Sequence, residues 1–169
     1  ADEIAHDLME PGTECYRQLE QEFRTEDIFL PEGGFDRLKL AKVIFSDVEK
    51  RNRLNDIVHP AVKQYVKQEA EKERKNPERK ILVLEAALLI EEHYDEICDE
   101  LWYIYTREEI REKRLMESRG YSKEKVRQIF ESQLKEEEFR KNCKVVIDNN
   151  NGLQETFSQI EQAIMGLNI

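Results

Sequence analysis

The chain of 169 residues lacks the features that mark several large classes of protein. It has no apolar run near the ~18 residues of a membrane-spanning helix, and no charged-then-apolar signal peptide at its start. Its three cysteines are odd in number and widely spaced, which argues against a disulfide framework or a zinc site. These absences predict a cytoplasmic protein without a membrane partner.

Glycine is scarce as well, with six residues in all, and none of them is followed by lysine. The loop Gly-x-x-x-x-Gly-Lys-Ser/Thr holds phosphate with its backbone N–H groups, and it is not among these residues. The dinucleotide-binding pattern Gly-x-Gly-x-x-Gly is also absent. The sequence by itself therefore shows no glycine-rich cradle for a nucleotide.

Basic residues are outnumbered, and the whole chain carries a net charge of −10. No sustained basic excess is present, which disfavours nucleic acid as a partner. Between Asp36 and Lys67, however, eight basic and four acidic residues give a net charge of +4, which leaves −14 for the remainder. An acidic protein with one basic segment favours a small anionic ligand.

Apolar residues at helical spacing predict a helical first half. Thr13 is placed to cap one helix, and Asp36 to cap another over residues 37–45. The next helix begins after residue 46 and is expected to break at His59-Pro60, because proline removes a backbone donor. A further helix should run from residue 61 to about residue 75.

Three short apolar runs in the second half, at residues 81–84, 101–105 and 145–147, are separated by predicted helices. Runs of this kind are typical of parallel strands buried on both faces, so the fold class is α/β. An α/β crossover needs a first strand that feeds the first helix, and such a strand would precede Ala1. A sheet edge left unpaired there would be a surface for self-association.

A series of short motifs follows in order along nearly the whole chain. They are Asp2-x-Ile4-Ala5-His6, Glu10-Pro11-Gly12, Asp36-Arg37, Leu40-Ala41, Ile44-Phe45, Arg53-Leu54-Asn55-x-Ile57-Val58-His59-Pro60, Leu88-Leu89-Ile90-Glu91, Arg114-Leu115, Ser122, Gln133 and Val146-Ile147-Asp148-Asn149. The most specific block runs from Leu54 to Pro60. This ordered series resembles the dephospho-CoA kinase family.

The resemblance implies a P-loop kinase-like fold, in which a parallel sheet is flanked by helices and carries a helical CoA-binding arm and a mobile lid. A single kinase-like domain over residues 1–169 is then expected. Its core would be residues 1–12, 79–105 and 143–169, its arm residues 13–78 and its lid residues 106–142. The family reaction is the ATP-dependent phosphorylation of the ribose 3′-hydroxyl of dephospho-CoA with Mg²⁺, in coenzyme A biosynthesis.

In the family the glycine-rich loop comes before the motif at which this chain opens. The resemblance therefore implies that the first strand, the P-loop and the first helix, roughly 30 residues on the scale of a βα unit, are not among the residues here. We expect the 169 residues alone to turn over little or no substrate. The alternative is a non-catalytic remnant that binds a CoA ligand or associates with its own copies.

On the acceptor side, the resemblance implies that Asp2 is the base for the 3′-hydroxyl and that His6, Arg37, His59 and Glu91 bind substrate. Each residue has a structural alternative. Asp2 can stabilise a helix N-terminus, His6 can be a packed side chain, and Arg37 can form a surface ion pair. His59 can be a buried imidazole at a helix break, and Glu91 a solvated strand end.

On the ATP side, the resemblance implies that Arg114 and Arg119 are lid arginines and that Asn149 lies near adenine. The alternatives are a solvated charged face for the arginines and a turn for the Asn-rich run. The second lid arginine is shifted by one residue from the family pattern, and Ala86-Ala87 replaces the usual proline before Leu88. No metal ligand is predicted.

Overall fold

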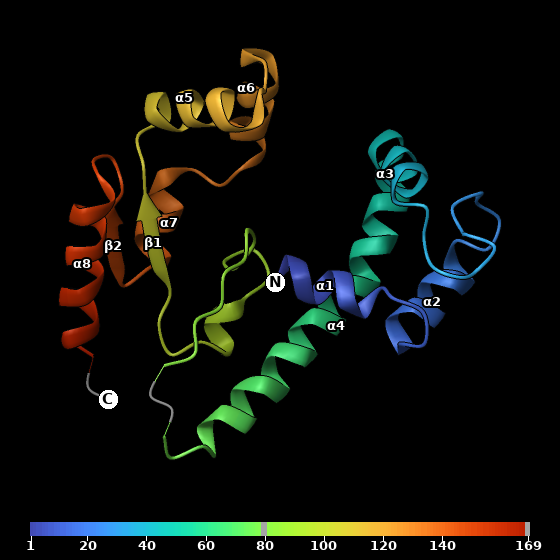
Figure 1. Ribbon diagram of the computed structural model, residues 1–169, viewed down its shortest axis with the longest axis horizontal. Helices are drawn as coiled ribbons and strands as arrows, with labels where there is room; N and C mark the ends of the chain where they lie inside the picture. Colours follow the sequence, from blue (N-terminus) through green and yellow to red (C-terminus); the bar gives the residue numbers. More distant parts are fainter. Residues whose placement is uncertain (79–80, 168–169) are drawn as a thin grey trace. The chain divides into compact units, whose positions relative to one another are not determined.

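Eight α-helices, one 3₁₀ helix and two strands form in the computed structural model, which describes residues 1–78 and 81–167 (Figure 1). The chain divides into two compact units, Ala1–Ile97 and Cys98–Ile169. Unit 1 holds α1 (Asp2–Leu8), α2 (Glu14–Glu22), α3 (Arg37–Ser46), α4 (Val48–Arg74) and η1 (Tyr94–Glu96). Unit 2 holds β1 (Trp102–Tyr105), α5 (Glu108–Arg119), α6 (Lys123–Ser132), α7 (Glu136–Asn142), β2 (Val145–Asp148) and α8 (Leu153–Met165).

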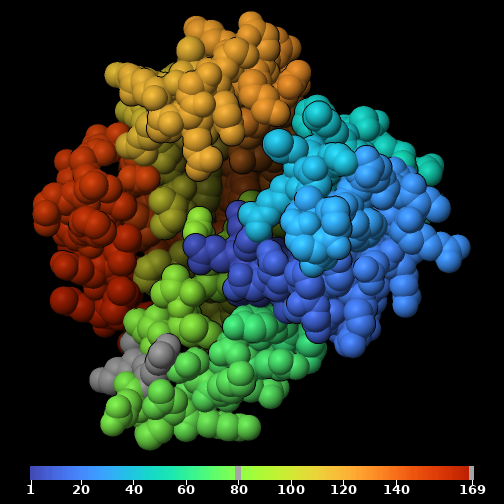
Figure 2. Space-filling model, turned by 45° about the vertical axis from the view of Figure 1, so that its right-hand side comes forward, coloured from blue at the N-terminus to red at the C-terminus, as the bar shows by residue number. Residues whose placement is uncertain are grey.

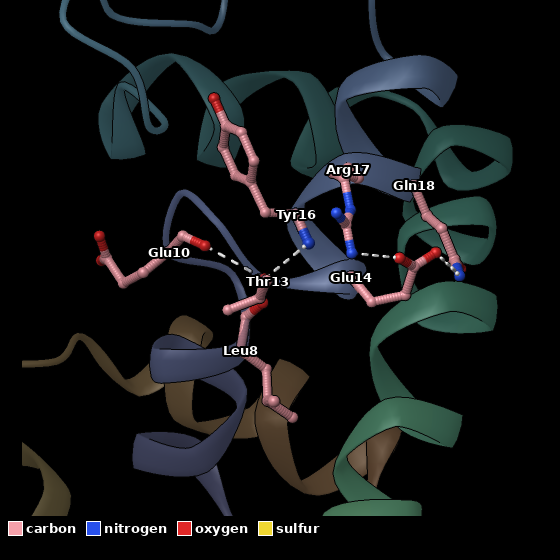
Figure 3. A network of polar contacts seen from close by, with 7 residues as sticks. All are labelled: Leu8, Glu10, Thr13, Glu14, Tyr16, Arg17 and Gln18. Carbon is pink, nitrogen blue, oxygen red and sulfur yellow. Dashed lines mark hydrogen bonds and ion pairs between the residues drawn. The ribbon is translucent and has the colours of Figure 1, made fainter.

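The predicted helix caps of unit 1 are confirmed. Thr13 Oγ1 accepts a hydrogen bond of 3.0 Å from the Tyr16 amide at the start of α2, and it donates to the Leu8 carbonyl at 2.5 Å (Figure 3). Asp36 Oδ1 accepts hydrogen bonds from the first amides of α3. These side chains satisfy N–H groups that have no partner within the helix, which fixes where each helix begins.

Helix α4 is continuous, so the predicted break at His59-Pro60 is wrong. Its buried residues Leu54, Val58 and Val62 recur every four positions on both sides of Pro60, and this side faces the other helices of unit 1. A proline inside a helix removes one backbone hydrogen bond. Packing of a continuous apolar face offsets that loss, and the helix continues past Pro60.

The core of unit 1 lies where α1, α2 and α3 meet α4. Leu19 and Ile28 are fully buried there, and the Tyr16 hydroxyl accepts a hydrogen bond from the Gly34 amide at 3.0 Å. In the space-filling view, the blue segment with α1 and α2 and the cyan segment leading to α3 form one continuous surface (Figure 2). The helices of unit 1 thus pack together as one body.

The sheet of unit 2 has two parallel strands, in register from Trp102 opposite Val145 to Tyr105 opposite Asp148. Two of the three predicted strands are therefore confirmed. Helix α8 packs on β2 and covers Ile147, which is 2% exposed. The connection from β1 to β2 passes through α5, α6 and α7, which confirms the predicted α/β character of the chain.

The predicted strand at Ile81–Leu84 is wrong, because this run has no strand pairing and Val83 is 83% exposed. A parallel strand needs a neighbour for its backbone N–H and C=O groups and cover on both faces. No described strand pairs with this run or covers it. Residues 79 and 80, at the start of the predicted core segment 79–105, lie outside the described residues. The division of a single domain into core, arm and lid stays a prediction.

Within the described residues, no helix is both long and apolar enough to cross a membrane.

Candidate functional site

Three of the residues predicted for substrate chemistry meet at one pocket of unit 1. Asp2 and His6 lie on α1, four residues apart, and Arg37 begins α3. Together with Glu3 and Asp7 they line an open depression of about 470 Å³. Positions 2 and 37 are far apart in the sequence, and the packing of α1 and α3 against α4 holds both elements in unit 1. The structure therefore brings the proposed base and the proposed anion-binding arginine to the same opening.

Arg37 is held in this pocket by two polar neighbours. Its Nη2 atom is hydrogen-bonded to Nε2 of His6 and lies 3.4 Å from Oε1 of Glu10. Glu10 Oε1 is also 3.7 Å from the His6 ring. Glu10 belongs to one of the quoted motifs, but the sequence did not predict it as a site residue. All three side chains remain largely exposed, so an incoming anion can reach the guanidinium.

His59 and Glu91 do not line that pocket. His59 Nδ1 lies 2.7 Å from Glu92 Oε1, and Lys63 Nζ donates to the Glu92 carbonyl at 2.9 Å. Glu92 thus ties α4 to the turns that precede η1, whereas Glu91 is exposed. The expected strand end at Glu91 is wrong, because residues 87–93 form turns.

The two predicted lid arginines lie on α5, and both are exposed. Arg114 and Arg119 are five residues apart, so they project about 140° apart around the helix axis. Arg119 is the last residue of α5, which ends at Gly120 in the left-handed conformation (φ 64°) that glycine adopts without strain. The two arginines therefore project from different sides of α5.

A second pocket, of about 230 Å³, lies in the segment predicted as the lid. Arg111 stacks over the Phe130 ring at 4.5 Å, and its Nη1 donates to Gln133 Oε1 at 3.1 Å. Its Nε is buried and has no hydrogen-bond partner among the described residues. Tyr103 stacks on Phe139 in the same pocket, and burial raises the pKa of its hydroxyl. The sequence did not single out Arg111, although its spacing of three from Arg114 puts both on one side of α5.

The Asn-rich run after β2 joins three elements. The Asn149 amide donates to the Tyr105 carbonyl at 2.8 Å, and its side-chain oxygen accepts from Thr156 Oγ1 of α8 at 3.1 Å. Asn150 Oδ1 accepts from the Arg107 amide at 2.7 Å, where α5 begins. Asn149 thus helps to hold the carboxyl end of the sheet. Asn150, which the sequence did not predict, does the same for the start of α5.

The described residues contain no group of three His, Cys, Asp or Glu side chains that could together hold a metal ion.

The parallel sheet and helical crossovers of unit 2 belong to the α/β class. In unit 1, a carboxylate and an arginine at one open pocket suit an enzyme that transfers a phosphoryl group. The dephospho-CoA kinase family model matches residues 1–155. The chain belongs to the dephospho-CoA kinase family, a family of kinases.

Relatives and solved structures agree with this assignment. The dephospho-CoA kinase of Listeria monocytogenes is 36% identical over 160 residues, which are 95% of this chain and 79% of that protein. The crystal structure of TT1252 from Thermus thermophilus has a TM-score of 0.77 and 27% identity, over 97% of this chain and 80% of that one. The dephospho-CoA kinase from Campylobacter jejuni shares the fold, with a TM-score of 0.70 and 24% identity over 97% and 81% of the two chains. The P-loop kinase-like fold expected from the sequence is confirmed.

Proposed function

We propose that the chain serves the phosphorylation of the ribose 3′-hydroxyl of dephospho-CoA by ATP, with the acceptor bound by unit 1. The observation that carries this proposal is the meeting of Asp2, His6 and Arg37 at one open pocket. A carboxylate to orient a hydroxyl and a guanidinium to hold a phosphate are the two groups that an acceptor site for phosphoryl transfer needs. Within the described residues, the cysteines Cys15, Cys98 and Cys143 form no disulfide, which supports a reducing, cytoplasmic setting.

In this proposal, Asp2 accepts a hydrogen bond from the 3′-hydroxyl and directs its oxygen at the γ-phosphorus of ATP. The new P–O bond forms as the bond from the γ-phosphorus to the bridging oxygen of ADP breaks, and the hydroxyl proton passes to the Asp2 carboxylate. Arg37 binds the diphosphate of the acceptor, since a planar guanidinium pairs well with phosphate oxygens. His6 and Glu10 keep the guanidinium over the pocket.

On the donor side, we propose that Arg114 and Arg119 contact ATP phosphates and that Asn149 lies near the adenine. His59 and Glu91 stay candidate substrate contacts. Mg²⁺ would neutralise phosphate charge, but the described residues offer no cluster to hold it, so we assign it no ligand and no step. The glycine-rich loop is not among these 169 residues, and we propose that they do not turn over substrate by themselves.

Separate calorimetric titrations of the 169-residue chain with dephospho-CoA and with ATP test this proposal. We expect dephospho-CoA to bind, ATP to bind weakly or not at all, and Arg37→Ala to weaken dephospho-CoA binding about tenfold, the loss of roughly one charge-assisted contact. Arg17→Ala is the matched control, because Arg17 is an exposed arginine paired to Glu14. Absence of dephospho-CoA binding would overturn the acceptor site, and ATP-dependent turnover by this chain would overturn the proposed inactivity.

Self-association through a sheet edge is the second candidate. β1 pairs with β2 on one side, no described strand pairs with its other edge, and Ile104 is 48% exposed. An open edge with apolar side chains can add a strand from another copy. Sedimentation over a range of concentrations tests this, and Ile104→Lys should abolish any dimer. A wild-type chain that stays monomeric throughout would exclude it.

A further inference from the structure

The pocket of about 230 Å³ in unit 2 has polar side chains that no step of the proposed function uses. It is lined by residues of the strand β1, of the helices α5, α6 and α7, and of the segments that join them. Arg114, Arg119 and Asn149, which we propose for ATP, are not among its described lining residues. The proposed function therefore leaves this pocket without a ligand.

Hydrogen-bond donors gather in this pocket without acceptors among the described residues. Thr106, directly after β1, is only 7% exposed, and no described residue hydrogen-bonds to its hydroxyl. The Tyr103 hydroxyl has no such partner either, and burial raises its pKa, so it stays a donor at neutral pH. Arg111 donates from Nη1 to Gln133 at 3.1 Å, but a guanidinium has five N–H donors. Because buried donors almost always have an acceptor, this group indicates a ligand that accepts hydrogen bonds.

The charges around the pocket suit a ligand with a single negative charge. Arg111 and Lys135 bring two positive charges, and Glu108 and Glu136 bring two negative charges. Glu136 already accepts a hydrogen bond of 2.6 Å from Arg140 Nε, so its charge is balanced from outside the pocket. One positive charge is then left to neutralise. A monoanion does this, whereas a phosphate dianion would leave an excess negative charge beside Glu108.

The rest of the pocket is apolar and largely aromatic. Phe139 stacks on Tyr103 with ring centroids 4.8 Å apart, and the Arg111 guanidinium lies 4.5 Å from the centre of the Phe130 ring. Leu134 lines the same pocket. A ring or a short acyl chain can pack against these side chains while its charged end meets Arg111. The volume of about 230 Å³ is below the roughly 300–1,000 Å³ of pockets for drug-sized ligands, so the ligand is smaller than a nucleotide.

We propose that this pocket binds a small organic monocarboxylate. Its carboxylate accepts hydrogen bonds from the Thr106 and Tyr103 hydroxyls and from Arg111, since a guanidinium and a carboxylate pair through parallel hydrogen bonds. Its acyl chain or ring covers the aromatic side chains of Phe130 and Phe139. The lining residues come from α5, α7 and the end of α6, so a bound carboxylate stabilises the packing of these helices against one another.

Titration of the isotope-labelled 169-residue chain with benzoate, followed by two-dimensional NMR, tests the proposal. We expect saturable shifts of the amides around the pocket, with a dissociation constant on the order of 1 mM for so small a ligand. Benzyl alcohol has the same ring without the charge and should bind about tenfold more weakly. Thr106→Val removes the hydroxyl at nearly constant volume and should weaken benzoate about tenfold. Tyr103→Phe keeps the ring and should act in the same direction.

The matched control is Thr25→Val, because Thr25 is an exposed threonine of unit 1. Circular dichroism establishes that each variant is folded. Equal binding of benzoate and benzyl alcohol would overturn the carboxylate assignment, and so would inorganic phosphate or ATP that displaces benzoate at a lower concentration than butyrate does. Absence of saturable shifts around the pocket would overturn the site, as would loss of benzoate binding in Arg37→Ala. None of these results bears on the binding of dephospho-CoA by unit 1, which the calorimetric titrations test separately.

Discussion

His59 Nδ1 lies 2.7 Å from Glu92 Oε1, and this contact joins the middle of α4 to the turns before η1. Because both side chains are partly buried, we expect Glu92→Gln to lower the free energy of unfolding by about 1 kcal/mol. Glu91→Gln, one residue away and exposed, should have no effect. Urea denaturation measures both. Equal effects of the two substitutions would contradict the structural role of this pair.

A second experiment on the pair His59 and Glu92 tests whether His59 contacts substrate. If His59 acts only through Glu92, His59→Ala should destabilise the fold and leave the dissociation constant of dephospho-CoA unchanged. Calorimetry under conditions in which the variant is fully folded measures this. A loss of affinity of about tenfold or more in the folded variant would assign His59 to the substrate after all.

Thr13 fixes the start of α2 and the end of α1 at once, because its hydroxyl both accepts from Tyr16 and donates to Leu8. We expect Thr13→Ala to lower the free energy of unfolding by about 1 kcal/mol, the usual loss for an N-cap. Thr13→Ser keeps the hydroxyl and should retain most of the stability. Thermal unfolding of the two variants checks this, and an Ala variant as stable as the Ser variant would disprove the capping role.

Arg111 holds α5 to α6 through the face of Phe130 and the side chain of Gln133. Lysine keeps the charge but loses the planar stacking and the fixed donor geometry, so Arg111→Lys should lower the free energy of unfolding by about 1 kcal/mol. Arg127→Lys is the control, since Arg127 is an exposed residue of α6 in a surface pair with Glu131. Denaturant unfolding that gives the same result for both would argue against this packing role.

The contacts of Glu100 predict that the free energy of unfolding falls as the pH is lowered. The Lys144 ammonium donates a hydrogen bond to its carboxylate, as does the Trp102 indole, and both hold the pKa of Glu100 below its ordinary value of 4.5. A carboxyl whose pKa is lower in the folded state stabilises the fold above its unfolded pKa. That stabilisation is lost as the pH falls through the folded value. Unfolding measured from pH 6 down to about pH 3 should therefore depend less on pH in Glu100→Gln than in the wild type.

Glu117→Gln, at an exposed position of α5, should leave that pH dependence as it is in the wild type. A Glu100→Gln profile that matches the wild type would show that this carboxyl does not contribute to acid stability.

Local features of the sequence were enough to place the helices. Thr13 and Asp36 cap α2 and α3 as predicted, because an N-cap depends on only the next three residues. The two errors in the fold concern interactions between distant segments. Pro60 is accommodated by the packing of a long apolar face, and the run Ile81–Leu84 lacks the neighbours that make a strand. Neither of these can be seen in a short window of sequence.

The residues of the candidate site were also predicted only in part, and those that were missed depend on contacts with other side chains. Asp2, His6 and Arg37 were predicted because they fall on family motifs, and the structure places them at one pocket. Glu10 and Arg111 were missed, since their importance lies in what they contact: Arg37 in one case, Phe130 and Gln133 in the other. For Arg111 the only signal was its spacing of three from Arg114, and surface helices are rich in such pairs. Glu10 lies four residues after His6 and also falls on a quoted motif, so the sequence offered two signals for it.

Pro60 gives α4 a mechanical property that a regular helix of 27 residues lacks. Its ring leaves the Asp56 carbonyl without an amide partner four residues on, so the helix can bend at this point without breaking a backbone hydrogen bond. Helix α4 packs against α3, which directly precedes it in the chain, and His59 beside the ring is anchored to Glu92. Pro60 therefore marks the position in α4 where a bend costs least, next to the His59 side chain that Glu92 anchors.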